Sequence, residues 1–179
     1  MRLHRRRAPN PYDYLPEVPS FDLTSTNITH ESRLHLPQVH PSAGGDNVSP
    51  QLSWSGFPAE TRSFAVTVYD PDAPTACGWW HWQVVDIPAD VTALPEGAGA
   101  PDGPGMPSAA VQMRNDYGDP GFGGAGPPPS DADHRYYFVV HALDTETLGL
   151  GPDTTNAVVG FHLTAHALAR ATVVCTYSH

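Results

Sequence analysis

The amino-acid sequence predicts a mainly β protein, an antiparallel β-sandwich with one helix near the end of the chain. Short runs rich in β-branched and aromatic residues recur along the sequence, and 20 prolines and 16 glycines mark the turns and loops between them. Apolar residues at helical spacing occur in one late stretch, from about residue 154. With 179 residues, 40% of them apolar, the chain is long enough for one domain with its own core.

The first half of the chain divides into a tail and a series of short strands. Residues 1–19 contain four prolines and a cluster of arginines, which indicates a flexible N-terminal tail ahead of a single domain at residues 20–179. Alternating or β-branched runs predict strands at residues 21–25, 33–36, 51–54, 63–69 and 80–87.

The second half begins with a long loop and ends with a helix and a strand. Residues 88–110 are rich in Ala, Gly and Pro, which predicts a surface loop before a brief strand at 110–114. The run 134–143 has the strongest strand pattern in the chain. Apolar spacing then predicts a helix from Ala157 to Arg170, with Asp153 or Thr154 as its N-cap, and a closing strand at 172–177.

The charge balance is acidic. All nine basic residues are arginines, and four of them (Arg2, Arg5, Arg6 and Arg7) lie in the first seven positions. The other five arginines stand against 19 acidic residues, so the rest of the chain carries a net charge near −14, compared with −10 for the whole. Such an acidic body argues against nucleic acid or an anionic membrane surface as the main partner.

The cysteine content and the hydropathy of the chain indicate the cellular compartment of the protein. Two cysteines, Cys77 and Cys175, are too few for a disulfide framework, and we expect both to be free. The N-terminus is basic but lacks the apolar stretch of a signal peptide, and no run approaches the roughly 20 apolar residues of a membrane-spanning helix. These features predict a soluble, cytoplasmic protein.

An acidic residue and a histidine are expected at the same end of two neighbouring strands. Side chains alternate along a strand, so Asp70 follows Phe64, Val66 and Val68 on one face of the run 63–69. The prolines of residues 70–74 (Asp-Pro-Asp-Ala-Pro) take the chain out of the sheet, and it returns with His81 at the start of the next strand.

A second pair of polar side chains follows a flexible loop. Residues 115–129 are rich in Gly and Pro, so their backbone can approach a ligand closely, and bare amides there can form an anion-binding nest. The strand after this loop places His134 and Tyr136 on one face at its beginning. Both pairs indicate a site at the ends of sheet strands.

These segments, taken in order, resemble the phosphatidylethanolamine-binding proteins, also called the Raf kinase inhibitor protein family, and their bacterial branch in particular. The resemblance rests on residues 70–74, 80–82 (Trp-His-Trp), 121–128 and 134–136 (His-Arg-Tyr), with support from residues 47–54 and the chain end, and it covers residues 20–179. It implies a large central antiparallel sheet packed on a smaller sheet. It also implies a small pocket for phosphate-like anions and phospholipid headgroups.

The resemblance also implies the residues of that pocket. By position, Asp70, His81, His134 and Tyr136 match the family's pocket residues, Gly126 and Pro127 match its pocket loop, and Pro74 and Trp80 match its wall. It implies a non-enzymatic binding protein with no catalytic residue, cofactor or metal ligand, and pairing as a homodimer. Two departures are Ala125-Gly126, where the bacterial branch often has Pro-Cys and which we expect to loosen the loop, and Cys175, where a glycine is common.

The chemistry of these side chains suits an oxyanion. Histidine rings, a tyrosine hydroxyl and loop amides can all donate hydrogen bonds to it, while Asp70 accepts from a histidine ring N–H and raises the basicity of that ring. We therefore expect binding to be stronger near pH 6 than near pH 8.

Three other functions stay open. A protein-binding inhibitor of a protease or kinase would use surface loops such as residues 88–110. An Asp with two His could bind zinc, although no His-x-x-x-His run supports it. A hydrolase would need a nucleophile beside a base, for which Tyr136 is a poor candidate and for which no Gly-x-Ser-x-Gly is present.

Overall fold

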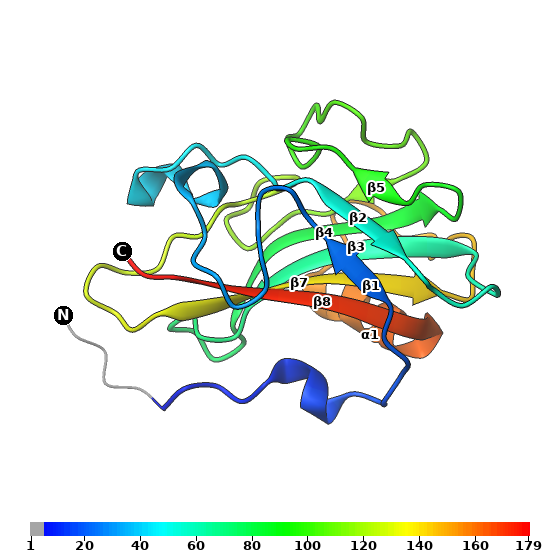
Figure 1. Ribbon diagram of the computed structural model, residues 1–179, viewed down its shortest axis with the longest axis horizontal. Helices are drawn as coiled ribbons and strands as arrows, with labels where there is room; N and C mark the ends of the chain where they lie inside the picture. The colour runs from blue at the N-terminus through cyan, green and yellow to red at the C-terminus, as the bar shows by residue number, and fades with distance from the viewer. Residues whose placement is uncertain (1–5) are drawn as a thin grey trace.

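Two antiparallel sheets face each other in the computed structural model, which describes residues 6–179 (Figure 1). The smaller sheet has the order β1-β2-β5, with strands β1 (Asp22–Thr24), β2 (Leu52–Ser55) and β5 (Ala93–Leu94). The larger sheet has the order β6-β4-β3-β7-β8, with strands β3 (Ser63–Asp70), β4 (Trp79–Pro88), β6 (Val111–Gln112), β7 (His134–Leu143) and β8 (Ala167–Tyr177). The predicted sandwich of a large and a small sheet is confirmed.

One α-helix and three short 3-10 helices complete the described residues. They are α1 (Asn156–His166), η1 (Pro11–Tyr14), η2 (Leu36–Gln38) and η3 (Pro41–Ala43). Each 3-10 helix has a proline in its first turn, where the missing N–H costs no hydrogen bond. Among the described residues, none of the helices is long and apolar enough to cross a membrane.

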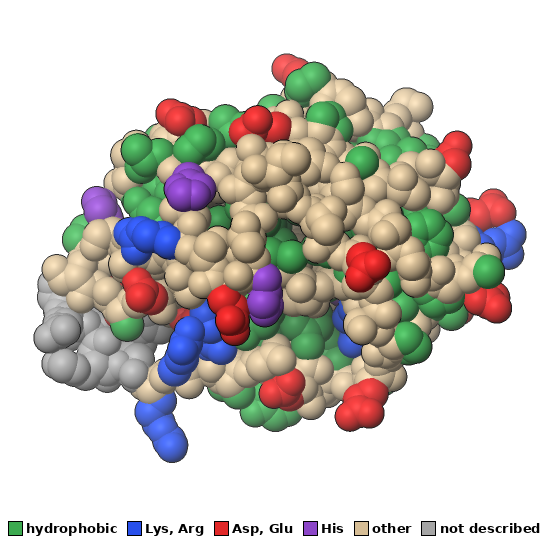
Figure 2. Space-filling view, viewed as in Figure 1, with side chains coloured by type: hydrophobic (Ala, Val, Ile, Leu, Met, Phe, Trp, Pro, Cys, Tyr) green, Lys and Arg blue, Asp and Glu red, His purple; other side chains and the backbone are tan. Residues whose placement is uncertain are grey.

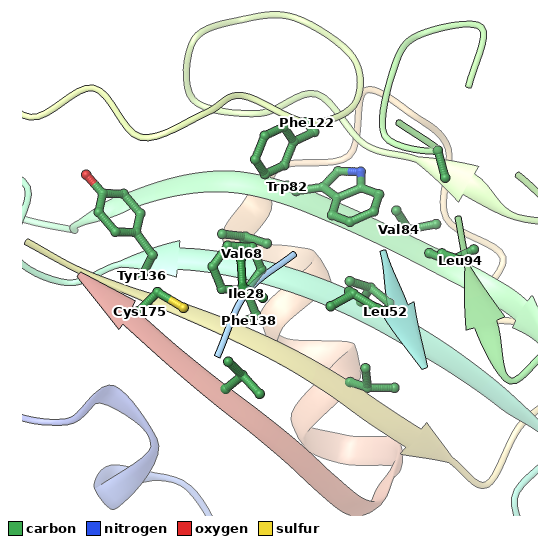
Figure 3. Close-up of a cluster of buried hydrophobic side chains, with 14 of the residues drawn as sticks. Ile28, Leu52, Val68, Trp82, Val84, Leu94, Phe122, Tyr136, Phe138 and Cys175 are labelled. Carbon is green, nitrogen blue, oxygen red and sulfur yellow. The ribbon is translucent and has the colours of Figure 1, made fainter. Parts of the chain in front are cut away.

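The main core lies between the two sheets. Alternate residues of β3 (Phe64, Val66 and Val68) face the small sheet, where Leu52 of β2 and Leu94 of β5 meet them, all nearly inaccessible to solvent. Figure 3 shows Leu52, Val68 and Leu94 in this cluster, with the ring of Tyr136 at its edge and the hydroxyl pointing away from the apolar groups. The alternation that predicts the face of Asp70 therefore also builds the core.

A second apolar cluster covers the opposite face of the large sheet. Val159 and Leu163 of α1 pack on Ala65 of β3, Val85 of β4 and Leu143 of β7. In Figure 1 the helix lies behind the large sheet, and the small sheet lies in front of it. Because both faces are covered, β3 is buried along nearly its whole length instead of alternating between buried and exposed.

The helix is shorter than predicted and the last strand is longer. The predicted helix runs to Arg170, but α1 ends at His166 and β8 begins at Ala167. Ala167 to Tyr177 pair with β7 along its full length, and this long ladder overrides the helix propensity of an alanine-rich stretch. The N-cap is Thr155, not Asp153 or Thr154, and Asp153 instead binds Arg114.

Two other predictions on the connecting segments need correction. The strand predicted at residues 33–36 reduces to a single bridge between Arg33 and Thr176, and the chain turns into η2 because Pro37 lacks the N–H that a sheet ladder needs. The loop predicted at 88–110 contains β5, which pairs with β2.

Cys77 and Cys175 are both free, the first exposed and the second buried.

The segment 6–19 lies against the large sheet. The ring of Tyr12 packs on Tyr137 and His141, with centroids 6.0 and 6.3 Å away. The N–H of Ala8 donates to Asp72 over 3.3 Å. The predicted tail thus makes specific contacts from residue 8 onwards, and Arg2 and Arg5 of its arginine cluster lie outside the described residues.

Removing one aromatic ring from the main core gives the first test of this packing. Phe64→Ala should lower the free energy of unfolding by about 3–5 kcal/mol, because the fully buried ring contacts both sheets. Urea denaturation measures the change. Phe161→Ala is the matched control, since that ring is 71% exposed and its loss should change stability little. Equal losses in both variants would contradict the proposed core.

Candidate functional site

Four of the predicted site residues meet at one end of the large sheet. Asp70 ends β3, His81 lies near the start of β4, and His134 and Tyr136 begin β7. The antiparallel register brings these ends together, since Asp70 faces Trp79 and Tyr69 faces Tyr137. They border a cavity of about 200 Å³, lined by Asp70, Ala73, Pro74, Thr75, Trp79, His81, Tyr117, Gly126, Pro127, Pro128, His134 and Tyr136.

A β-bulge aims His81 into this cavity. Val68 faces Trp82 and Tyr69 faces Trp80, so one step along β3 spans two residues of β4. As a result both His81 and Trp82 point toward the side of the small sheet, Trp82 into the core and His81 into the cavity.

His81 is a buried, neutral ring with one free nitrogen. Its Nδ1 lies 2.8 Å from the carbonyl oxygen of Gly123, which accepts a hydrogen bond and fixes the proton on Nδ1. Burial lowers the pKa of His81, and the nearby charge of Asp70 opposes this only in part. In this tautomer Nε2 is an acceptor, and it is buried with no partner among residues 6–179.

His134 is held between two carboxylates. Its Nδ1 lies 2.7 Å from Asp70 and its Nε2 lies 3.1 Å from Asp131. Burial acts to lower the pKa of His134, but the hydrogen bonds and charges of Asp70 and Asp131 outweigh it, and the pKa is raised. This pairing stabilises the fold fully below the ordinary histidine pKa of about 6.5, and the contribution is lost as the pH rises through the raised value.

Tyr136 presents its hydroxyl to the cavity. The ring packs edge-on against His81, with centroids 5.1 Å apart, and the hydroxyl is buried with no partner among the described residues. Burial raises the pKa of Tyr136 well above its ordinary value, and the negative charge of Asp70 adds to the effect. The side chain therefore stays a neutral hydroxyl that can donate.

A pair of charged residues behind the cavity fixes the loop after β3. The guanidinium of Arg135 binds the carboxylate of Asp72 with contacts of 2.7 and 2.8 Å. Burial of Asp72 acts to raise its pKa, but the hydrogen bonds and charge of Arg135 lower it overall. The backbone N–H of Asp72 donates to Asp70 over 2.7 Å, so the pair also positions the carboxylate that holds His134.

The glycine-rich loop is tied down rather than loosened. The N–H of Ala125 donates to Gln38 over 3.0 Å, a bond that a proline at this position could not make, and its carbonyl accepts from His40. Asn47 accepts from the N–H of Gly124 over 2.7 Å. Backbone hydrogen bonds between Ala125 and the segment before η3 thus hold the loop in the absence of the proline.

Gly126 leaves room beside Tyr117. A Cβ atom at Gly126 would lie 3.0 Å from the Tyr117 hydroxyl, which donates to the carbonyl of Gly124 over 3.1 Å. His40 stacks on the other side of Tyr117, with ring centroids 4.3 Å apart. Tyr117 and the Gly126-Pro127 turn together form one side of the cavity.

The predicted wall residue Trp80 is corrected to Trp79. Trp79 is two residues from His81 and shares its face of β4, whereas Trp80 points to the opposite face and packs on Tyr69, with centroids 4.4 Å apart. Counting alternation back from His81 would have found Trp79. Nothing in the sequence pattern pointed to Tyr117 or Asp131, because loop contacts place both.

The charges around the site are unevenly distributed. A second hollow beside the cavity, of about 280 Å³, is lined in part by Arg6, Arg7, Asp131 and His134. In Figure 2 acidic side chains are scattered over the viewed face, whereas most of the visible basic ones lie in its left half. Within residues 6–179 no cluster of three or more His, Cys, Asp or Glu side chains has a metal-binding arrangement.

Comparisons with known proteins agree on one family. A family model described as phosphatidylethanolamine-binding protein matches residues 24–178. The chain is 49% identical over 163 residues to the UPF0098 protein YbcL of Escherichia coli K12, covering 90% of this chain and 89% of YbcL. It is 47% identical over 147 residues to YbhB of the same organism, covering 80% of this chain and 92% of YbhB.

Solved structures give the same result. The crystal structure of E. coli YbcL, described as a new member of the mammalian PEBP family, matches with a TM-score of 0.86 over 89% of this chain and 99% of that chain. A phosphatidylethanolamine-binding protein homologue from Chlamydia trachomatis matches with a TM-score of 0.75 at 31% identity, over 89% of this chain and 98% of that chain.

The two carboxylates around His134 can be tested by titration. Asp70→Asn should lower the pKa of His134, because it removes the first of the two charges that oppose burial. NMR titration of the histidine rings measures this, with the His134 signal assigned from a His134→Gln spectrum. Asp133→Asn is the control, since Asp133 is exposed and lies near Arg33 instead. An unchanged His134 pKa in Asp70→Asn would rule out the charge pairing.

Proposed function

This chain belongs to the phosphatidylethanolamine-binding protein family, and on that premise we propose that it binds a phosphate-like anion or phospholipid headgroup in the cavity of His81 and Tyr136, without converting it. The observation that carries the proposal is a pair of buried polar atoms, Nε2 of His81 and the hydroxyl of Tyr136. Neither has a partner among residues 6–179, and both belong to residues that line the cavity.

Unpaired polar atoms favour a ligand that satisfies them. A buried donor or acceptor without a hydrogen bond costs about 1–3 kcal/mol. Tyr136 offers a donor and neutral His81 an acceptor, so the fitting ligand both accepts and donates within one small polar group. A phosphate that carries one proton has both: its P–O⁻ accepts from Tyr136 and its P–OH donates to His81.

The number of protons taken up on ligand binding follows from the states of the two histidines. Both ring nitrogens of His134 already face carboxylates, at 2.7 and 3.1 Å, so His134 supplies charge near the site rather than a free donor. A fully deprotonated phosphate would place its lone pairs against Nε2 of His81, unless that nitrogen takes up a proton. Binding of the dianion therefore consumes about one proton, on His81 or on the ligand.

The size of the cavity favours a headgroup over a whole lipid. Its volume of about 200 Å³ is below the roughly 300–1,000 Å³ of typical small-molecule sites, so it suits one compact polar group. Pro74, Trp79 and Pro127 supply an apolar rim to this polar centre. An ester chain attached to the phosphate would extend outward from the cavity.

The protonation state of the Tyr136 hydroxyl supports ligand binding without catalysis. A nucleophile needs a lowered pKa or a base in hydrogen-bond contact; burial instead raises the pKa of this hydroxyl, and no base among residues 6–179 is hydrogen-bonded to it. The competing role as a protease or kinase inhibitor relied on the loop 88–110. That segment is tied to the body through β5 and through the N–H of Gly99, which donates to Ser49 over 2.8 Å.

Loss of either unpaired atom should weaken binding. His81→Ala and Tyr136→Phe should each raise the Kd for O-phosphorylethanolamine by at least about tenfold, as measured by NMR titration. His35→Ala and Tyr14→Phe are matched controls at exposed positions and should bind like the unaltered protein. If the unaltered protein shows no saturable shift at millimolar ligand, the anion site is refuted and the role as a protease or kinase inhibitor is favoured instead.

Affinity for phosphate should fall as the pH rises. The second pKa of a phosphate ester is about 6, so above pH 7 the Kd should rise about tenfold per pH unit. Calorimetry in two buffers of different ionisation enthalpy should count about one proton taken up per ligand at pH 8. Sulfate has no proton to give in this range, so sulfate binding with proton uptake would locate the proton on His81. Equal phosphate affinity at pH 6 and pH 8 would contradict this mode.

A further inference from the structure

A larger groove lies on the opposite face of the large sheet, away from the anion cavity. It has a volume of about 400 Å³ and lies between α1, the segment around η1 and the outer side of β3, β4 and β7. Its lining is mainly aromatic and apolar and includes Tyr12, Trp80 and Phe161. Because alternate residues of β4 point to opposite faces, the sheet itself separates Trp80 in this groove from His81 in the anion cavity.

The groove contains a cation without a carboxylate. Among residues 8–179 the other four arginines each lie within ion-pair distance of an acidic side chain, but Arg170 does not. Its Nη1 donates to the carbonyl of Pro16 over 3.1 Å, and its guanidinium lies over the ring of Tyr12 at 5.8 Å. Its Nε is buried and has no partner within the described chain. In a protein of net charge −10, this guanidinium has no acidic partner within the described chain and lies beside an apolar surface.

A buried histidine adds a second unsatisfied atom to the same groove. His141 is 3% exposed and its Nε2 lies 3.1 Å from the Thr67 hydroxyl, but its Nδ1 has no partner in the described part of the chain. Burial lowers the pKa of His141 to about 3, and the charge of Arg170 contributes, so the ring is neutral. Two buried nitrogens on neighbouring strands thus lack hydrogen bonds at the lining of one groove.

A glycine keeps the groove open. Gly160 lies in the middle of α1, where glycine is among the least favourable residues for a helix. A Cβ atom built at Gly160 would meet nothing within 4 Å, so packing does not demand the glycine. Phe161 beside it is 71% exposed, which leaves a large apolar ring at the rim. The helix thus lacks a side chain at the position where one would fill the groove.

We propose that this groove is a second ligand site, which binds a small organic acid with an aromatic or aliphatic body. The carboxylate pairs with Arg170, and the body packs against Tyr12, Trp80 and Phe161. Charge complementarity selects the occupant, because a neutral apolar molecule would leave the guanidinium without a counter-ion. This site is independent of the anion cavity, since the two share no lining residue.

The experiment uses 2-naphthoate as the probe, with neutral 2-naphthylmethanol for comparison, and measures binding by calorimetry on the full chain. Gly160→Leu should fill the groove and weaken naphthoate binding at least about tenfold while leaving the melting temperature equal or higher. Gly160→Ala is the matched control for helix propensity and should retain most of the binding. Inorganic phosphate should not compete.

A second variant tests the charge. Arg170→Gln should weaken naphthoate binding at least about tenfold yet change 2-naphthylmethanol binding little, whereas Arg62→Gln, at an exposed ion pair elsewhere, should change neither. Unchanged naphthoate affinity in Gly160→Leu, or no saturable binding to the unaltered protein, would overturn the proposal. So would sedimentation showing a dimer that Gly160→Leu dissociates, since the groove would then be an interface between two copies.

Discussion

The five-stranded sheet is covered on both faces, and this constraint governs where the protein can act. The small sheet buries the side that carries Phe64 and Val68, and α1 buries the side that carries Ala65 and Val85. Within residues 6–179, these covering elements leave little of either face free for a ligand. Openings remain at the strand ends and at the margins of the covering elements, which is where the anion cavity and the aromatic groove lie.

Asp70 connects the sheet to the anion cavity. One carboxylate oxygen accepts from the N–H of Asp72, and the other accepts from Nδ1 of His134. Asp72 is itself held by Arg135 of β7, so the loop after β3 and the first residues of β7 form one network. Such a closed set of hydrogen bonds keeps the site in one geometry before a ligand arrives.

The sequence predicts those parts of the site that depend on strand periodicity. Period-two alternation places Asp70 with Val68, and Tyr136 with His134, because each pair lies within one regular strand. It fails where long-range contacts decide. Ala167 joins β8 because its partner on β7 is available, and Asp131 reaches His134 because the loop folds back, neither of which leaves a local pattern.

The pairing of β8 also bears on how the chain reaches its native state. Both edges of β8 are engaged, by β7 on one side and on the other by residues from the first fifth of the chain: Glu31 donates to the carbonyl of Val174, and Arg33 is bridged to Thr176. The core between the sheets includes Val173 and Cys175 from this same strand. Contacts of such long sequence separation form late and slowly. During synthesis, the edge of β7 that pairs with β8 therefore stays open until residues 167–177 leave the ribosome, and an unpaired strand edge favours aggregation.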